Sequence, residues 1–412
     1  MSRDCDNSAI CRAGPHPGDL VDIMASALVR FRDWPHALAT LLLSTLLTLH
    51  PYPANAGGRQ SGRAQWITEN TVADLERAPK WLLAGSPSLV IGDGSSPRDR
   101  LNLAGSPRRL ADGGVVLVND LHEVRYYDAR GKIARIVRRP AWRNGGFRQI
   151  WSAHVLGRDS VLVFDIAQSR FTVLDDRGRS ARGFEVPFRT RGQSSTALLR
   201  DGSVIAMESV LPEFTRKPQF RHYQVPLVRI APQATRIDTL LLLPAVLYGD
   251  SSGYDLPPFG PEPLFAAAGD RVYAGYNAKY EIAVLGSGGE RIGRIRVPLR
   301  SNTVTRTDIE VHQGANPRGR ASAMPRSAYW NEFPAFSRLI VDRLDKLWVQ
   351  RSPRPGAANS EWHIYDPAGR VRARILMPAR FRPTDIGRDY ILGTFRDAAG
   401  LLTVRLYDLT RS

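Results

Sequence analysis

The sequence predicts an all-β fold, a six-bladed β-propeller, and two observations support this prediction. The first is a unit of short apolar strands, clearest between Asp112 and Val137, in which no apolar stripe has the period of a helix. The second is the recurrence of that unit along the chain. A period of about 40–50 residues, with four short strands in each repeat, is typical of β-propellers.

The clearest repeat contains short strands joined by tight turns. Residues 115–118 form a run of valine and leucine with the length and β-branched content of a buried strand. Residues 124–127 and 133–137 supply the next two strands. The turn between them ends in Gly131, which can take the positive φ that a hairpin turn needs.

The same order of strands and turns returns along the chain. The later copies lie at residues 157–186, 201–243, 269–297, 339–377 and 389–408. Because the last copy lacks its outermost strand, we expect residues 81–83 and 89–91 to complete it. Their pairing with residues 401–409 would close the ring and remove two free sheet edges. The sequence therefore predicts six blades in a single domain, residues 66–412.

The first 56 residues are expected to be removed from the mature protein. Residues 24–56 carry basic residues, then an apolar run at 37–49, then the small-residue pattern Ala54-Asn55-Ala56, which is the order of a secretory signal peptide. The apolar run is too short to span a bilayer comfortably. We therefore predict cleavage after Ala56, a flexible leader at residues 57–65 and a mature chain with no transmembrane span. The protein would be exported to the periplasm or the extracellular space.

Charge and cysteine content limit which binding partners and disulfides are expected. The formal net charge is +17, from 57 basic and 40 acidic residues, which could serve recognition of an acidic polymer. No run of five or more basic residues occurs, so nucleic acid is not expected as a partner. Cys5 and Cys11 both precede the cleavage site, so no disulfide is expected in the domain. The mature protein is expected to be a monomer.

The repeats carry a resemblance to a known group of proteins. Residues 112–131 with their echo at 160–178, the segment 334–349 and the tail 381–393 resemble the bacterial, secreted six-bladed β-propellers of the NHL-like superfamily. The resemblance covers about residues 66–408 and implies a fold rather than an activity, since propellers host many unrelated functions. The turn at Leu344-Asp345 departs from the usual Asp-Gly or Asn-Gly and is expected to be looser.

The ends of the second strands offer candidate metal ligands. Equivalent strand ends in successive units should lie near one face of the ring, and they include Asp120, Asp165 and Glu208. Three carboxylates could bind Ca²⁺, which favours oxygen ligands. The favoured interpretation is that Asp120 and Asp165 cap the following turns through side chain-to-backbone hydrogen bonds. No cofactor is then expected, and Ca²⁺ is the alternative.

Two segments break the period, residues 212–226 and 301–333, and long loops on a rigid scaffold often carry binding surfaces. Residues 307–312 could form one helical turn. Tryptophans in irregular segments could stack on sugars, although such residues are more often inter-blade core. The ligand-binding candidates are Arg221, His222, Tyr223, Trp142 and Trp330.

No catalytic motif is present. The sequence contains no G-x-S-x-G elbow, Walker loop or G-x-G-x-x-G, and its histidines show no local zinc spacing. No catalytic residue is therefore predicted. The sequence favours an exported, non-catalytic binding or scaffold protein that recognises a protein or glycan through its loop faces. The alternative is a metal-dependent hydrolase or lyase, lactonase-like, with ligands converging on the propeller channel.

Overall fold

The computed structural model describes residues 65–94, 98–138, 146–187, 196–208, 210–213, 215–250, 253–299, 302–315 and 324–411. The predicted signal peptide, residues 1–56, and nearly all of the predicted leader lie outside these residues, as does Trp142. The described chain is nearly all β-structure, with two short α-helices. None of the helices in this described part is long and apolar enough to cross a membrane.

Six sheets of four or five strands make up most of the described chain, and we number them in chain order. Sheet 1 contains β4 (Ala104–Arg109), β5 (Val115–Asn119), β6 (Glu123–Tyr127) and β7 (Ile133–Val137). Sheet 2 contains β8 (Ile150–Val155), β9 (Val161–Asp165), β10 (Arg170–Leu174) and β11 (Ser180–Glu185). Sheet 3 contains β12 (Ala197–Leu198), β13 (Val204–Met207), β14 (Gln219–Ile230), β15 (Ile237–Asp250) and β16 (Gly253–Asp255).

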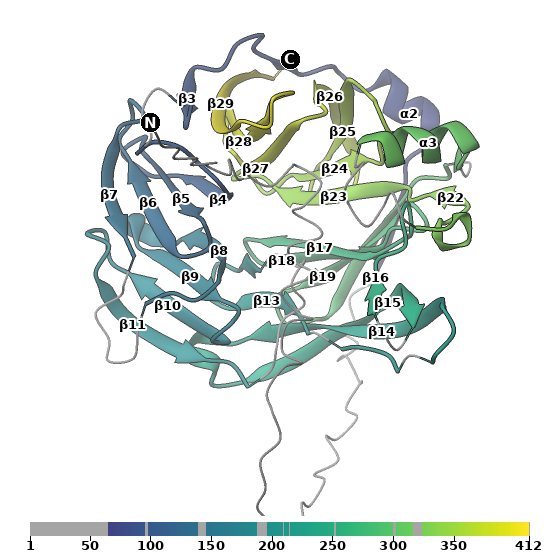
Figure 1. The fold of residues 1–412 in the computed structure, drawn as a ribbon, viewed down its shortest axis with the longest axis horizontal. Helices are drawn as coiled ribbons and strands as arrows, with labels where there is room; N and C mark the ends of the chain where they lie inside the picture. Colours follow the sequence, from purple (N-terminus) through teal and green to yellow (C-terminus); the bar gives the residue numbers. More distant parts are fainter. Residues whose placement is uncertain are drawn as a thin grey trace, which may run out of the picture.

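The second half of the domain continues this pattern. Sheet 4 contains β17 (Pro263–Ala268), β18 (Arg271–Tyr276), β19 (Glu281–Gly286), β20 (Arg291–Arg296) and, from the start of the domain, β1 (Trp66–Glu69). Sheet 5 contains β23 (Phe336–Val341), β24 (Leu347–Arg351), β25 (Asn359–Tyr365) and β26 (Val371–Pro378). Sheet 6 contains β27 (Phe381–Ile386), β28 (Tyr390–Arg396), β29 (Leu402–Thr410), β2 (Leu82–Leu83) and β3 (Leu89–Ile91). Figure 1 shows the sheets following one another in chain order, from β7 at the left through β11 and β14 to β26 and β29 at the top.

Smaller elements connect the sheets. The α-helix α2 (Val72–Arg77) lies between β1 and β2 in the chain, and α3 (Arg306–Ala315) lies between β20 and β23. The strands β21 (Asn302–Thr303) and β22 (Glu332–Phe333) pair beside α3. Three 3₁₀ turns complete the described elements: η1 (Gly157–Asp159), η2 (Pro232–Ala234) and η3 (Arg326–Ala328).

An aspartate holds the tight turn of four hairpins in the same way. In the β6–β7 turn the Asp128 carboxylate accepts two backbone N–H hydrogen bonds of 2.9 Å. Asp175, Asp342 and Asp366 accept the corresponding pair in their own turns. The looser turn predicted after Asp342 is therefore wrong, because these bonds are made and Asp345 itself takes the positive φ of 60°.

Apolar side chains between consecutive sheets form the core. Val116 and Val163 belong to one cluster that joins sheets 1 and 2. Another cluster contains Ile91 and Val404 of sheet 6 together with Leu117 of sheet 1. Because each sheet is covered on both faces, β5 and β9 are buried at every residue, which explains their uninterrupted apolar runs.

The start of the domain runs along the outer edges of sheets 4, 5 and 6. β1 pairs in parallel with β20, Lys80 forms a bridge with Arg374 of β26, and β2 and β3 pair with β29. Residues predicted to pair across the two ends of the domain do so, with Ile91 opposite Val404. The addition of β1 to sheet 4 was not predicted.

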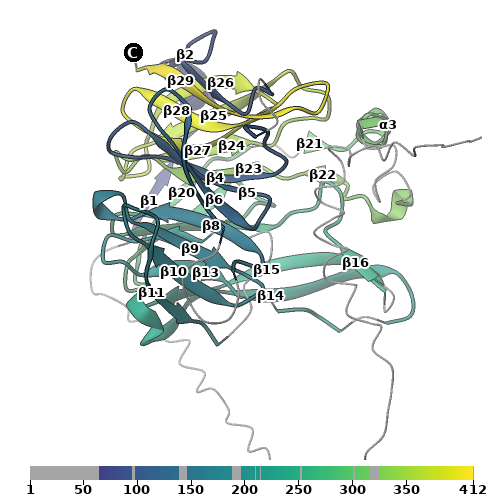
Figure 2. The same cartoon turned by 60° about the vertical axis from the view of Figure 1, so that its left-hand side comes forward.

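Both segments that break the period contain regular structure. The loop predicted at residues 212–226 is wrong from Gln219 onward, since β14 begins there and pairs with β15 along its length. Proline has no backbone N–H and is rare inside sheets, but the carbonyl of Pro226 still accepts the backbone N–H of Glu208 at 3.0 Å. The helical turn predicted at residues 307–312 is confirmed as part of α3. Figure 2 shows β14, β15, β16 and α3 extending on the same side of the sheets.

The packing of β3 should contribute measurably to the free energy of unfolding. Ile91 is 2% exposed within the cluster between sheets 6 and 1. We expect Ile91→Ala to lower the free energy of unfolding by about 2–5 kcal/mol, because it leaves a cavity in that core. Urea unfolding of the purified chain measures the change.

Leu82→Ala on β2 is the matched control, since Leu82 is 62% exposed. Its effect should stay within about 0.5 kcal/mol. Equal effects of the two substitutions would contradict the assigned packing of β3.

Candidate functional site

The two segments that break the repeat period meet around a cavity. Its volume is about 430 Å³, and its lining residues are His222, Tyr223, Gln224, Pro244, Ala245, Pro261, Tyr276, Ala278 and Trp330. β14 and β15 supply one wall because their hairpin extends well beyond the neighbouring strands (Figure 2). Trp330 supplies another wall from the segment that follows η3.

Trp330 is held on the cavity wall by its neighbours. Its ring meets Phe220 edge-on with the centroids 5.3 Å apart, and its centroid lies 6.2 Å from that of His222. Its backbone N–H donates to the carbonyl of Pro258 at 3.0 Å. The side chain remains partly exposed, so a rigid indole is reachable from solvent.

The structure brings together three of the five predicted ligand-binding residues. His222, Tyr223 and Trp330 line the cavity, although Trp330 is more than 100 positions from the other two in the chain. Arg221 does not line it, and Trp142 lies outside the described residues. Sequence reasoning missed Tyr276, because a tyrosine at the end of an apolar strand gives no signal of its own.

The lining is suited to binding more than to proton transfer. It combines aromatic rings and prolines with the amide of Gln224 and the imidazole of His222. The described lining contains no carboxylate, so it offers no acid–base pair with His222. Aromatic walls with a few polar groups are typical of sites that hold a sugar ring or an apolar side chain.

A second cavity of about 260 Å³ adjoins the first. Glu262, Asn277, Ser337 and Ser352 are its polar lining residues. Glu262 follows Pro261 in the chain and Asn277 follows Tyr276, so the two cavities share the loops of sheet 4. The hydroxyl oxygens of Ser337 and Ser352 are enclosed and have no hydrogen-bond partner among the described residues.

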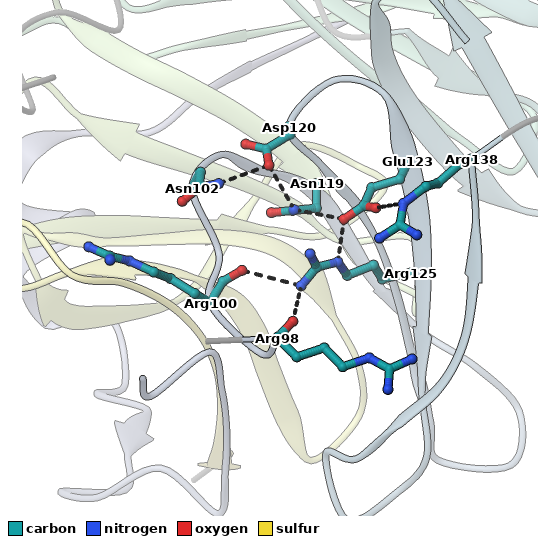
Figure 3. Close-up of polar contacts among 8 residues, drawn as sticks. All are labelled: Arg98, Arg100, Asn102, Asn119, Asp120, Glu123, Arg125 and Arg138. Atoms are coloured by element: carbon teal, nitrogen blue, oxygen red, sulfur yellow. Dashed lines mark hydrogen bonds and ion pairs between the residues drawn. The ribbon is translucent and has the colours of Figure 1, made fainter. Parts of the chain in front are cut away.

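Asp120 lies in a polar network at the β5–β6 turn (Figure 3). Its carboxylate accepts the side-chain amides of Asn102 at 2.9 Å and Asn119 at 3.3 Å. Asp120 and Leu121 both have positive φ, 52° and 62°, as the two central residues of a type I′ β-turn require. The Asp120 carboxylate therefore ties Asn102 to the turn through side chains, and does not form the predicted backbone cap.

A buried ion pair underlies this network. The Glu123 carboxylate accepts Arg125 Nε at 2.5 Å, Asn119 Nδ2 at 2.9 Å and Arg138 Nε at 2.8 Å (Figure 3). Burial alone would raise the pKa of Glu123, but these hydrogen bonds and the adjacent charges hold that pKa below its ordinary value. Arg125 also donates to the carbonyls of Arg98 and Arg100, both at 3.2 Å. Glu123 and Arg125 therefore both bind groups of the protein itself.

Asp165 caps its own turn. Its buried carboxylate accepts the backbone N–H groups of Arg148, Gln149 and Gln168 at 2.6, 3.2 and 3.2 Å, and the Gln168 side-chain amide at 2.7 Å. Among the residues that the structure describes, no three His, Cys, Asp or Glu side chains are grouped to hold a metal ion, Asp120, Asp165 and Glu208 included. The Ca²⁺ site stays a prediction that rests on sequence alone.

His154 of β8 is a buried imidazole. Its Nε2 lies 2.8 Å from Thr196 Oγ1, which in turn lies 2.6 Å from Ser152 Oγ. Burial and, to a lesser degree, the charge of Arg108 lower the pKa of His154 to about 3. The ring is therefore neutral at physiological pH and acts as a hydrogen-bonding partner of Thr196.

Comparison with known proteins relates the chain by fold alone. No family model matches the sequence, and no curated protein matches it. A solved member of the DUF4221 family from Bacteroides vulgatus is similar, with 9% identity and a TM-score of 0.50 over 82% of this chain and 100% of that one. A presumed exported protein of Bacteroides fragilis has 12% identity and a TM-score of 0.46, over 84% of this chain and 100% of that one.

Virginiamycin B lyase from Staphylococcus aureus is also similar, with 12% identity and a TM-score of 0.39, covering 77% of this chain and 83% of the lyase. The fold is nearly all β-structure, built of four- and five-stranded sheets, and solved β-propellers are among its structural neighbours. Activity does not transfer at this distance, because one fold hosts many functions.

The role of Asp165 can be separated from metal binding. Because its carboxylate satisfies three backbone N–H groups, we expect Asp165→Ala to lower the free energy of unfolding by about 1–3 kcal/mol. The loss should be the same with and without EDTA, as measured by denaturant unfolding.

Asp120→Ala is the matched control, because Asp120 binds only side-chain amides in this structure. A metal site is indicated instead if EDTA destabilises the wild type and either substitution abolishes that response. Metal analysis of the purified chain would then identify the ion.

His154 should make stability depend on pH. Its folded pKa of about 3 lies below the ordinary value of 6.5. The unfolded chain therefore takes up the proton first, and stability is lost as pH falls from 6.5 toward 3. Between pH 7 and pH 5 this group should remove about 2 kcal/mol.

Denaturant unfolding at both pH values measures this loss, and His154→Gln should reduce it. His122→Gln, at an exposed position, controls for removal of a histidine. An unchanged pH dependence in His154→Gln would show that the imidazole is not held neutral.

Proposed function

We propose that the six sheets are the blades of a six-bladed β-propeller and that β2 and β3 close its ring. Six apolar clusters support this proposal, because each lies between one pair of neighbouring sheets. Five of them follow the chain from sheet 1 to sheet 6, and the remaining one joins sheet 6 back to sheet 1. Strand pairing of β3 with β29 occurs at the same junction.

The protein is exported, on the same proposal, to the periplasm or the extracellular space. The order of basic, apolar and small residues in residues 24–56 supports export. No cysteine follows Cys11, so the domain contains no thiol that an oxidising compartment would modify.

Its function is to bind a protein or a glycan, without catalysis, at the cavity beside Trp330. The observation that carries this proposal is the convergence of His222 and Tyr223 with Trp330, from two segments that both interrupt the repeat. Insertions on a repeated scaffold cost little stability and commonly carry recognition. Two such insertions form one cavity here, which favours a shared ligand.

The ligand group that fits is a sugar ring or an apolar side chain. The volume of about 430 Å³ lies within the range of small-ligand sites. Trp330 and Tyr276 present rings for stacking, and Gln224 can donate and accept hydrogen bonds. The absence of a carboxylate in the described lining favours binding over hydrolysis.

Substitution of Trp330 tests the proposed site. Wild-type protein is applied to a glycan array and to a peptide array, and the strongest hit is titrated. We expect Trp330→Ala to weaken that binding by about tenfold or more, since loss of a buried aromatic anchor costs over 1 kcal/mol. Trp330→Phe, which keeps a ring, should bind with intermediate affinity.

Leu242→Ala is the matched control on the same hairpin, because Leu242 is 50% exposed and does not line the cavity. It should bind as the wild type does. Unchanged affinity of Trp330→Ala for the ligand would contradict the proposed site. Chemical conversion of the ligand by the wild type would show that the protein is an enzyme.

A further inference from the structure

Arginines from three sheets gather beside β27. Arg108 of β4 donates through Nη1 to the carbonyl of Thr384, and Arg338 of β23 donates through Nη1 to the carbonyl of Pro383 at 3.5 Å. Arg382 precedes these two carbonyls on β27 itself. Figure 1 shows β4 and β23 on either side of β27, so the two side chains reach the strand from opposite neighbours.

These guanidinium groups have many more donors than the protein uses. Each has five N–H donors, and the contacts with β27 use one from Arg108 and one from Arg338. Among the described residues, none of Arg108, Arg338 and Arg382 forms an ion pair with a carboxylate. No nitrogen of Arg108 or Arg338 is both enclosed and unpartnered, so their remaining donors face space that solvent can reach.

The nearest acid on β27 is already occupied. The Asp385 carboxylate accepts Arg343 at 2.6 and 2.9 Å and the backbone N–H of Arg109 at 2.8 Å. It offsets part of the charge of Arg108, while Arg343 beside it adds to that charge. Asp385 therefore cannot also neutralise Arg338 or Arg382.

The arginines also act on one another. Burial and then the charge of Arg382 lower the pKa of Arg338 to about 10. Burial and Arg382 lower the pKa of Arg396, on β28, in the same way. Like charges held close together repel one another, and a bound anion would relieve that repulsion.

One carboxylate competes for this position. Glu262 interacts favourably with Arg338, and it lines the cavity of about 260 Å³ together with Ser337 and Ser352. Glu262 satisfies part of one arginine and leaves the rest of the cluster unpaired.

We propose that Arg108, Arg338 and Arg382 form an anion-binding site beside β27, which takes the phosphate or carboxylate group of a small ligand. The planar guanidinium fork matches an oxyanion with two parallel hydrogen bonds, which a lysine does not offer. Arg108 and Arg338 are held by the adjacent carbonyls of Thr384 and Pro383, and Arg382 interacts with Arg338, so the three forks can serve one ligand group. The site is separate from the cavity beside Trp330 and does not depend on the function proposed there.

Calorimetric titration of the full chain at low salt with inorganic phosphate, and separately with citrate, tests the site. Saturable binding of either anion is expected, with a rise in melting temperature because the ligand binds the folded state. Phosphate alone would identify a phosphate-bearing ligand, and citrate alone a carboxylate-bearing one. Arg382→Gln should weaken binding about tenfold. Arg382→Lys, which keeps the charge and loses the fork, should fall between it and the wild type.

Two further variants sharpen the result. Glu262→Gln should bind the anion more tightly, because it removes the competing carboxylate. Arg130→Gln removes an equal charge from an exposed turn and should leave affinity within about twofold of the wild type. The proposal is overturned if neither anion binds the folded wild type, or if Arg130→Gln weakens binding as much as Arg382→Gln does.

Discussion

Sheet-on-sheet burial of apolar side chains is the constraint on which the rest of this molecule depends. Each sheet has two apolar faces, as the complete burial of β5 and β9 shows, so no sheet is stable without a neighbour on either side. The clusters between sheets satisfy that need, and the one shared by Ile91, Leu117 and Val404 satisfies it between the ends of the domain. Stability thus comes from the clusters between all the sheets. The outward-facing loops can therefore vary in length and sequence at little cost in stability.

That freedom accounts for the candidate site. β14 and β15 extend past their neighbours, and the segment with α3 interrupts the connection between sheets 4 and 5. The second insertion has a small apolar core of its own, which includes Ile309, Tyr329 and Phe333, so Trp330 is positioned by packing. The cavity arises where two additions to a regular scaffold meet.

Charge is handled differently in different parts of the molecule. Around the β5–β6 turn, Glu123 forms ion pairs with both Arg125 and Arg138 (Figure 3). Beside β27 the balance is reversed, since Arg338 and Arg382 lie together while Asp385 is held by Arg343. Like charges held close together repel, and a bound anion would supply a counter-charge at this position.

The sequence by itself determined most of the strands and the aspartate and glycine turns, because these follow from apolar runs and short-range turn chemistry. It also predicted the pairing of residues 89–91 with 401–409, because the last copy of the repeat lacks a strand. It also named His222, Tyr223 and Trp330 separately. Only the tertiary structure decided that these three share one cavity, that Asp165 serves its own turn, that β14 is a strand through Pro226, and that Arg108, Arg338 and Arg382 gather beside β27. The physical reason is that such contacts join residues far apart in the chain, whose distances depend on how whole sheets pack, and local patterns carry no record of that packing.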